Sequence, residues 1–209
     1  MGSLHGYRPD FQLVTRCQSG DISAFNGLVC RHKDRIYRLV YRMLGDGNDV
    51  DDVTQEIFLR AYRRIGGFQH RSSFSTWLTR IAVNYCINYL RNRRCLKFLP
   101  LNRFSWLGRK PSSMEPQTAI ESAERYEKVF ESIGSLPPKQ KAVIILHYFE
   151  DHSCEDLAEI LDCSIGTVKS RLFHARKKLK ERLEPYLRNG EWIDTSSEIG
   201  GEGYEVFKM

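Results

Sequence analysis

The chain has 209 residues, which suits one compact domain or two small ones, and its 41% hydrophobic content excludes a wholly disordered protein. Thirty-two Lys and Arg residues against 26 Asp and Glu give a net charge of +6. No apolar run approaches the ~20 residues of a membrane span, and the first residues lack a signal-peptide pattern, so we expect a cytoplasmic protein without membrane insertion. The six cysteines form no C-x-x-C pair and are expected to be free thiols.

The positive charge is unevenly placed. Residues 1–95 carry a net charge of +7, whereas residues 191–209 carry −4. A basic body favours a polyanionic partner but identifies none, because many proteins of similar charge bind no nucleic acid.

Helical periodicity dominates the sequence and alternating strand patterns are not evident, so the expected fold is all-α. In the first half, three apolar stripes at helical spacing predict three helices that close a small core. The stripes are Ile36, Leu39, Val40, Met43 and Leu44; then Val50, Val53, Ile57 and Ala61; and then Phe74, Trp77, Leu78, Ile81, Ala82, Tyr85 and Tyr89.

Prolines and glycines interrupt residues 96–117, which we interpret as a flexible linker. Helical pattern resumes over residues 120–133 and breaks at 134–138. It continues in three further helices, one to about Phe149, one over Glu155–Leu161 and one over Ser164–Leu183. The prediction is therefore two small helical domains, residues 10–95 and 118–187. The acidic residues 188–209 are expected to be disordered.

The two helices that flank Asp162-Cys163 form the most specific local pattern. Their apolar stripes face each other across a turn of a few residues, as in a helix-turn-helix. Ser164 is placed as an N-cap with Thr167 three residues on, and Asp162 is a residue type that tolerates left-handed backbone.

The outer face of the second of these helices has short polar groups near its start, which reach base edges, and cations toward its end, which pair with phosphates. The face consists of Thr167, Lys169, Ser170, Phe173, His174, Lys177 and Lys178. The alternative is a plain helical hairpin whose charges face water.

Opposite the aromatic stripe of the helix that starts at Phe74 lies a ridge suited to a nucleic-acid backbone and to unstacked bases. Its residues are Arg80, Asn84, Asn88, Arg91, Arg93 and Arg94. A solvated helix face explains the same pattern equally well. In the preceding loop, Phe68, His70 and Arg71 could hold a flipped base, although a phenylalanine in such a position more commonly caps a core.

The second predicted helix has the opposite chemistry. Its first turn holds Asp49, Asp51 and Asp52, which stabilise the helix dipole, and this role alone could account for them. One face, however, combines acids with an apolar contact, and we expect that face to bind protein rather than DNA. This face consists of Asp52, Gln55, Glu56 and Leu59.

The sequence contains no residue pattern that indicates a catalytic site. The residues His147, His152, Cys154 and Cys163 match no usual spacing of zinc ligands, and the acids at positions 49–52 have no His or Lys partner typical of a nuclease. We therefore expect no metal, no cofactor and no enzymatic activity.

Together these segments resemble the sigma-70 family of bacterial RNA polymerase initiation factors, in its short extracytoplasmic-function branch and especially its envelope-stress members. Residues 49–62 (DVDDVTQEIFLRAY) look like the region-two segment that docks on polymerase, and residues 74–84 (FSTWLTRIAVN) are similar to the promoter-melting helix. Residues 136–140 (LPPKQ) and 162–176 (DCSIGTVKSRLFHAR) resemble region four.

The resemblance implies the partners. The face of Asp52, Gln55 and Glu56 would bind core RNA polymerase, which offers the clamp helices of its largest subunit and also its second-largest subunit. The loop at Phe68 would capture a flipped base of the minus-ten element of promoter DNA, and the helix from Ser164 would enter the minus-thirty-five element. An anti-sigma factor, membrane-anchored in some cases, is the implied inhibitor.

Three features depart from the family pattern. His174 stands where arginine is common, Gln69-His70-Arg71 replaces the usual loop, and the acidic tail has no counterpart. The rival hypothesis is a stand-alone helix-turn-helix regulator, which has no need of the acidic face.

Overall fold

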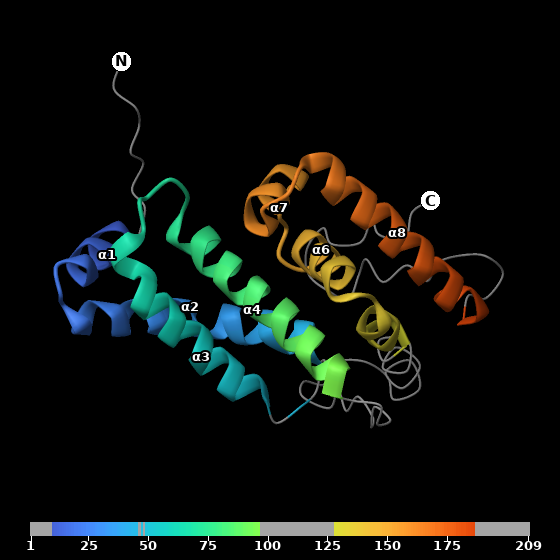
Figure 1. The fold of residues 1–209 in the computed structure, drawn as a ribbon, viewed down its shortest axis with the longest axis horizontal. Coiled ribbons are helices and arrows are strands. Elements are labelled where there is room, and N and C mark those ends of the chain that lie inside the picture. Colours follow the sequence, from blue (N-terminus) through green and yellow to red (C-terminus); the bar gives the residue numbers. More distant parts are fainter. Residues whose placement is uncertain (1–9, 46, 48, 97–127, 187–209) are drawn as a thin grey trace, which may run out of the picture. The chain divides into compact units, whose positions relative to one another are not determined.

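The structure is a computed structural model that describes residues 10–45, 47, 49–96 and 128–186. Every regular element in these ranges is a helix, which confirms the all-α expectation (Figure 1). The chain divides into two compact units, Met1–Tyr89 and Leu90–Met209. The expected linker, apart from its first residue, and the acidic tail lie outside the described residues.

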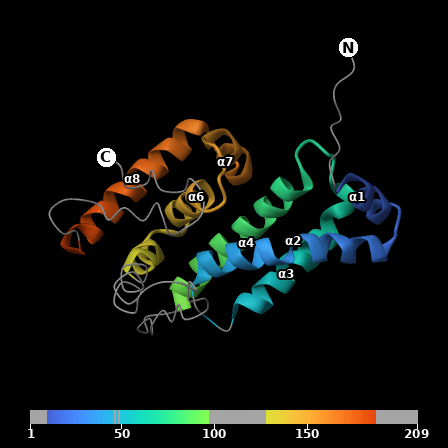
Figure 2. The same cartoon turned by 180° about the vertical axis from the view of Figure 1, so that it is seen from behind.

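The described residues of the first unit form a bundle of four α-helices, of which the sequence predicted three. They are α1 (Phe11–Gln18), α2 (Ile22–Leu44), α3 (Asp49–Arg64) and α4 (Phe74–Leu96), and Figure 2 shows them from behind. The short 3₁₀ helix η1 (Ile65–Gly67) follows α3, and the boundary between the two units falls within α4, after Tyr89. The sequence pattern missed α1 because this helix has eight residues and buries only Val14 completely. It also missed the first half of α2, which begins where the Asp21 carboxylate accepts a hydrogen bond from the Ala24 amide.

An aliphatic core holds these helices together, and α2 contributes most of it. The largest fully buried side chains of this unit are Leu28, Ile36, Leu39, Met43, Ile57 and Leu78. Each such burial contributes about 1.5–3 kcal/mol.

The second unit is built from a helical segment at residues 128–135, α6 (Pro138–Tyr148), α7 (Cys154–Leu161), α8 (Ile165–Leu183) and the 3₁₀ helix η2 (Glu184–Tyr186). Pro138 occupies the first position of α6, where its missing N–H leaves no hydrogen bond unmade. Its core is again aliphatic, with Leu136, Ile144, Ile145, Leu146, Leu157 and Ile160 fully buried.

The turn between α7 and α8 confirms the predicted helix-turn-helix. Ser153 and Asp156 form a capping box at the start of α7, and Asp162 ends that helix with a left-handed φ of 51°. Two residues later, the Ser164 hydroxyl accepts a hydrogen bond from the Thr167 amide at 3.2 Å and starts α8. Both ends of the turn are thus specified locally.

Candidate functional site

The predicted outer face of α8 is open to solvent. Lys169, Ser170, Phe173, His174, Lys177 and Lys178 are all exposed. Phe173 is 60% exposed, and its ring lies edge-on to His174 with 5.5 Å between centroids. Thr167 differs, because it is half-buried and its hydroxyl lies 2.9 Å from the Ser164 hydroxyl within the cap.

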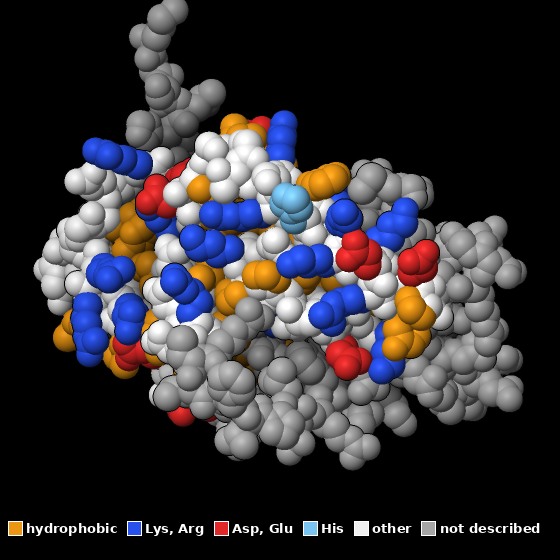
Figure 3. Space-filling view, turned by 45° about the vertical axis from the view of Figure 1, so that its right-hand side comes forward, with side chains coloured by type: hydrophobic (Ala, Val, Ile, Leu, Met, Phe, Trp, Pro, Cys, Tyr) orange, Lys and Arg blue, Asp and Glu red, His pale blue; other side chains and the backbone are white. Residues whose placement is uncertain are grey.

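The charge of α8 is strongly positive. Residues 165–183 include seven Lys or Arg residues and one Glu. Two of the arginines serve the fold, since Arg176 donates to the Tyr148 hydroxyl at 2.7 Å and Arg171 donates to the Cys163 sulfur at 3.5 Å. The exposed cations suit a polyanion, and Figure 3 shows Lys and Arg side chains at the surface with several Asp and Glu side chains between them.

The predicted ridge on α4 opens onto a hollow beside α3. Asn84, Asn88 and Arg91 are exposed and Arg80 and Arg93 are half-buried, whereas the side chain of Arg94 lies outside the described part of the chain. The hollow has a volume of about 270 Å³ and is lined by Arg60, Arg64, Trp77, Arg80, Ile81, Asn84, Tyr85 and Asn88. Arg60 and Arg64 could not be assigned to this surface from the sequence, because they lie on α3 rather than α4.

The loop before α4 packs against the core through Phe68. Phe68 is 6% exposed and packs against Trp77 and Phe74, with ring centroids 5.1 and 6.2 Å away. This burial fits the alternative in which the Phe68 ring caps the core, and a role of the loop in holding a flipped base stays a prediction. His70 has a positive φ of 55° and lies close to the Phe68 ring, while Arg71 is exposed.

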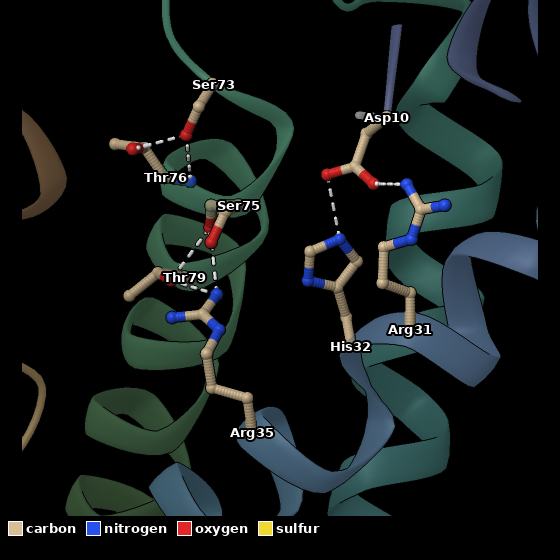
Figure 4. Close-up of polar contacts among 8 residues, drawn as sticks. All are labelled: Asp10, Arg31, His32, Arg35, Ser73, Ser75, Thr76 and Thr79. Atoms are coloured by element: carbon tan, nitrogen blue, oxygen red, sulfur yellow. Dashed lines mark hydrogen bonds and ion pairs between the residues drawn. The ribbon is translucent and has the colours of Figure 1, made fainter. Parts of the chain in front are cut away.

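Two polar clusters hold α2 against its neighbours (Figure 4). The buried Asp10 carboxylate lies 2.9 Å from His32 Nε2 and accepts a hydrogen bond from Arg31 at 2.6 Å. Burial lowers the pKa of His32 below its ordinary value, although Asp10 acts in the opposite direction. In the second cluster, Arg35 of α2 donates to two groups of α4, the Thr79 hydroxyl at 2.8 Å and the Ser75 carbonyl at 3.1 Å.

The predicted acidic face of α3 is accessible. Asp51, Asp52, Gln55 and Leu59 are exposed, and Asp49 and Glu56 are half-buried. The Leu59 side chain is 49% exposed. Glu56 accepts a hydrogen bond from Arg60 Nε at 2.7 Å, one helical turn further along.

An apolar groove of about 460 Å³ runs beside this face, between α2 and α3. It is lined by Ile22, Phe25, Val29, Lys33, Thr54, Gln55, Phe58, Leu59 and Tyr62. Ile22 and Tyr62 are 64% and 40% exposed. The buried Thr54 hydroxyl oxygen has no hydrogen-bond partner within the described residues. The sequence indicated only Gln55 and Leu59, because the groove exists only once α2 and α3 pack together.

Metal chemistry has no visible basis in the described ranges. No group of three or more His, Cys, Asp or Glu side chains is arranged there to hold a metal ion. His147 instead lies with Nδ1 2.9 Å from the His152 carbonyl oxygen. Within the same ranges, no helix is long and apolar enough to cross a membrane.

Two segments of the chain match known protein families. Residues 28–95 match Sigma-70 region 2, and residues 126–179 match Sigma-70, region 4. The ECF RNA polymerase sigma-E factor of Escherichia coli is 39% identical over 185 residues, which cover 86% of this chain and 96% of that protein. The sigma-E factor of Haemophilus influenzae is 36% identical over 198 residues, covering 85% of this chain and 97% of that protein.

The chain belongs to the sigma-70 family. Its relatives place it in the extracytoplasmic-function branch, whose members are alternative sigma factors that direct RNA polymerase to promoters.

Solved structures are similar in fold to this sigma factor. CnrH, in complex with the cytosolic domain of CnrY, is 26% identical with a TM-score of 0.60 over 84% of this chain and 97% of its own. The sigma factor RpoE of Bartonella quintana, in complex with the anti-sigma factor NepR, is 21% identical with a TM-score of 0.61 over 78% of this chain and 98% of its own.

Proposed function

We propose that this sigma factor binds core RNA polymerase through α3 and promoter DNA through α4 and α8. The observation that carries the proposal is the separation of chemistry on the described surface. An acidic face with an adjoining apolar groove lies on one side of α3, while the basic and amide side chains lie on α4 and α8. Sigma-70 factors are initiation factors without catalysis of their own.

For polymerase binding, α3 offers charge and apolar area together. Asp49, Asp51, Asp52, Gln55 and Glu56 are the polar contacts, and Leu59 at the groove is the apolar one. The clamp helices of the largest polymerase subunit are the proposed partner, with further contacts to the second-largest subunit. Burying Leu59 and the groove would supply the free energy, and the acids would orient the complex.

For DNA binding, the two basic surfaces have different tasks. The α4 ridge and the loop residues His70 and Arg71 would bind the minus-ten element and stabilise its open strand, with Phe68 as a buried support. The exposed face of α8 would lie in the major groove of the minus-thirty-five element, where Ser170 and His174 reach bases and Lys177 and Lys178 reach phosphates.

We also propose an anti-sigma factor as a partner. RpoE is solved with an anti-sigma factor and CnrH with the cytosolic domain of CnrY. The apolar groove of this chain is a surface that such a protein could cover.

The alternative is a stand-alone DNA-binding regulator, which would use α8 but has no use for the α3 face. Reconstitution with core polymerase on genomic fragments, followed by mapping of run-off transcripts, separates the two. We expect discrete start sites that disappear with Asp52→Asn/Leu59→Ala. Transcription no different from core polymerase alone would favour the regulator.

A further inference from the structure

Arg60 is the side chain that joins the two surfaces of α3. Its Nε donates to Glu56 Oε1 at 2.7 Å, and its guanidinium carbon lies 4.4 Å from the centroid of the Tyr85 ring. Glu56 belongs to the face proposed for polymerase, whereas Tyr85 lines the hollow beside α4. The Arg60 and Glu56 side chains are 43% and 31% exposed, so both are accessible to a partner.

The hollow has the composition of an anion site. Three guanidinium groups line it, those of Arg60, Arg64 and Arg80, together with the exposed amides of Asn84 and Asn88. Of these arginines, Arg60 forms an ion pair with the Glu56 carboxylate. Guanidinium groups bind phosphate through two parallel hydrogen bonds, and amides add neutral donors. A phosphate of the DNA backbone therefore fits this hollow.

We propose that Arg60 and Arg64 bind a backbone phosphate of promoter DNA in this hollow, and that Glu56 restrains Arg60 until polymerase engages the Glu56 carboxylate. This inference rests on the proposed function, since it assigns Glu56 to the polymerase interface. In the free protein, the Glu56 carboxylate competes with the phosphate for the same guanidinium. When a cation of polymerase binds Glu56, Arg60 becomes available to DNA.

The restraint is a modest one. An exposed ion pair one helical turn apart contributes about 0.3–0.5 kcal/mol, which is about twofold in affinity. Repulsion between the carboxylate and an incoming phosphate adds to this, so we expect a total effect of about twofold to fivefold. Glu56 thus tunes DNA binding rather than blocking it.

The phosphate site is tested with the full chain and a fluorescent oligonucleotide that contains a junction of duplex and single strand. We expect Arg60→Gln and Arg64→Gln each to reduce the slope of log K against log salt by about 0.7–0.9. Arg38→Gln is the matched control, because Arg38 is exposed on α2 and does not line the hollow. Slopes that are unchanged, or reduced equally by Arg38→Gln, would overturn the site. Circular dichroism verifies folding, and Arg60→Lys should retain the slope.

The coupling is tested in the same assay without polymerase. Glu56→Gln should raise DNA affinity about twofold to fivefold, and the gain should vanish in an Arg60→Gln background. Asp34→Asn, which removes one exposed carboxylate from α2, is the charge-matched control. No gain, or a gain equal in both backgrounds, refutes the restraint. The proposed function is judged separately, because Glu56→Gln should weaken binding to core polymerase while it strengthens binding to DNA.

Discussion

Leu59→Ala tests the polymerase interface most directly. Complete burial of a leucine is worth about 1.5–3 kcal/mol. Because Leu59 is 49% exposed in the free protein, only about half of that, roughly 0.7–1.5 kcal/mol, remains to be gained on binding. The Kd for core polymerase should therefore rise about threefold to twelvefold. A labelled chain titrated with core polymerase and followed by fluorescence anisotropy measures this change.

The stability of the variant serves as its first control. Leu59 is on the surface, so we expect the free energy of unfolding in urea to fall by about 1 kcal/mol or less. Tyr37→Ala is the matched variant, since Tyr37 is 40% exposed on α2 and does not line the groove. If Leu59→Ala binds core polymerase as tightly as the unmodified chain, or no worse than Tyr37→Ala does, the α3 interface is wrong.

Four further substitutions address other parts of the protein. Lys178→Ala should weaken DNA binding about equally across sequences and reduce the salt slope by about 0.9, whereas His174→Ala should change base preference at one position; a selection from randomised duplexes would show both, and equal effects would contradict the face assignment. Burial lowers the pKa of His32 in the folded protein, so below about pH 6.5 the unfolded chain binds a proton more readily than the folded chain does. The free energy of unfolding should therefore decrease as the pH is lowered through this range. His32→Gln should flatten that part of the pH dependence of urea unfolding, and an identical profile would refute it. Phe68→Ala should lower the free energy of unfolding by about 3–5 kcal/mol, and a loss below about 1 kcal/mol would show that Phe68 is not a core residue.

The helix-turn-helix could be predicted from the sequence because its determinants are local. The capping residue Ser164, the left-handed Asp162 and the apolar stripe of α8 all lie within one short segment. The outer face of α8 then follows from helical periodicity alone. The acidic face of α3 is predictable for the same reason, since its residues share one helix.

Features that depend on two helices meeting could not be predicted in this way. The apolar groove joins Ile22 of α2 to Tyr62 of α3, and the hollow joins Arg60 of α3 to Tyr85 of α4. Periodicity shows which face of each helix is apolar, but not which residues of different helices come together. Phe68 illustrates the same limit, because only packing against Trp77 and Phe74 shows that its ring is buried.

By itself, the sequence determined the all-α class, the family and the faces of single helices, since each depends on residues close together in the chain. The tertiary structure decided that Phe68 is core, that a groove adjoins the acidic face, and that Arg60 links Glu56 to the hollow. Each of these features brings together side chains of different elements, and their distances are set only when α2, α3, α4 and the loop before α4 pack around a common core.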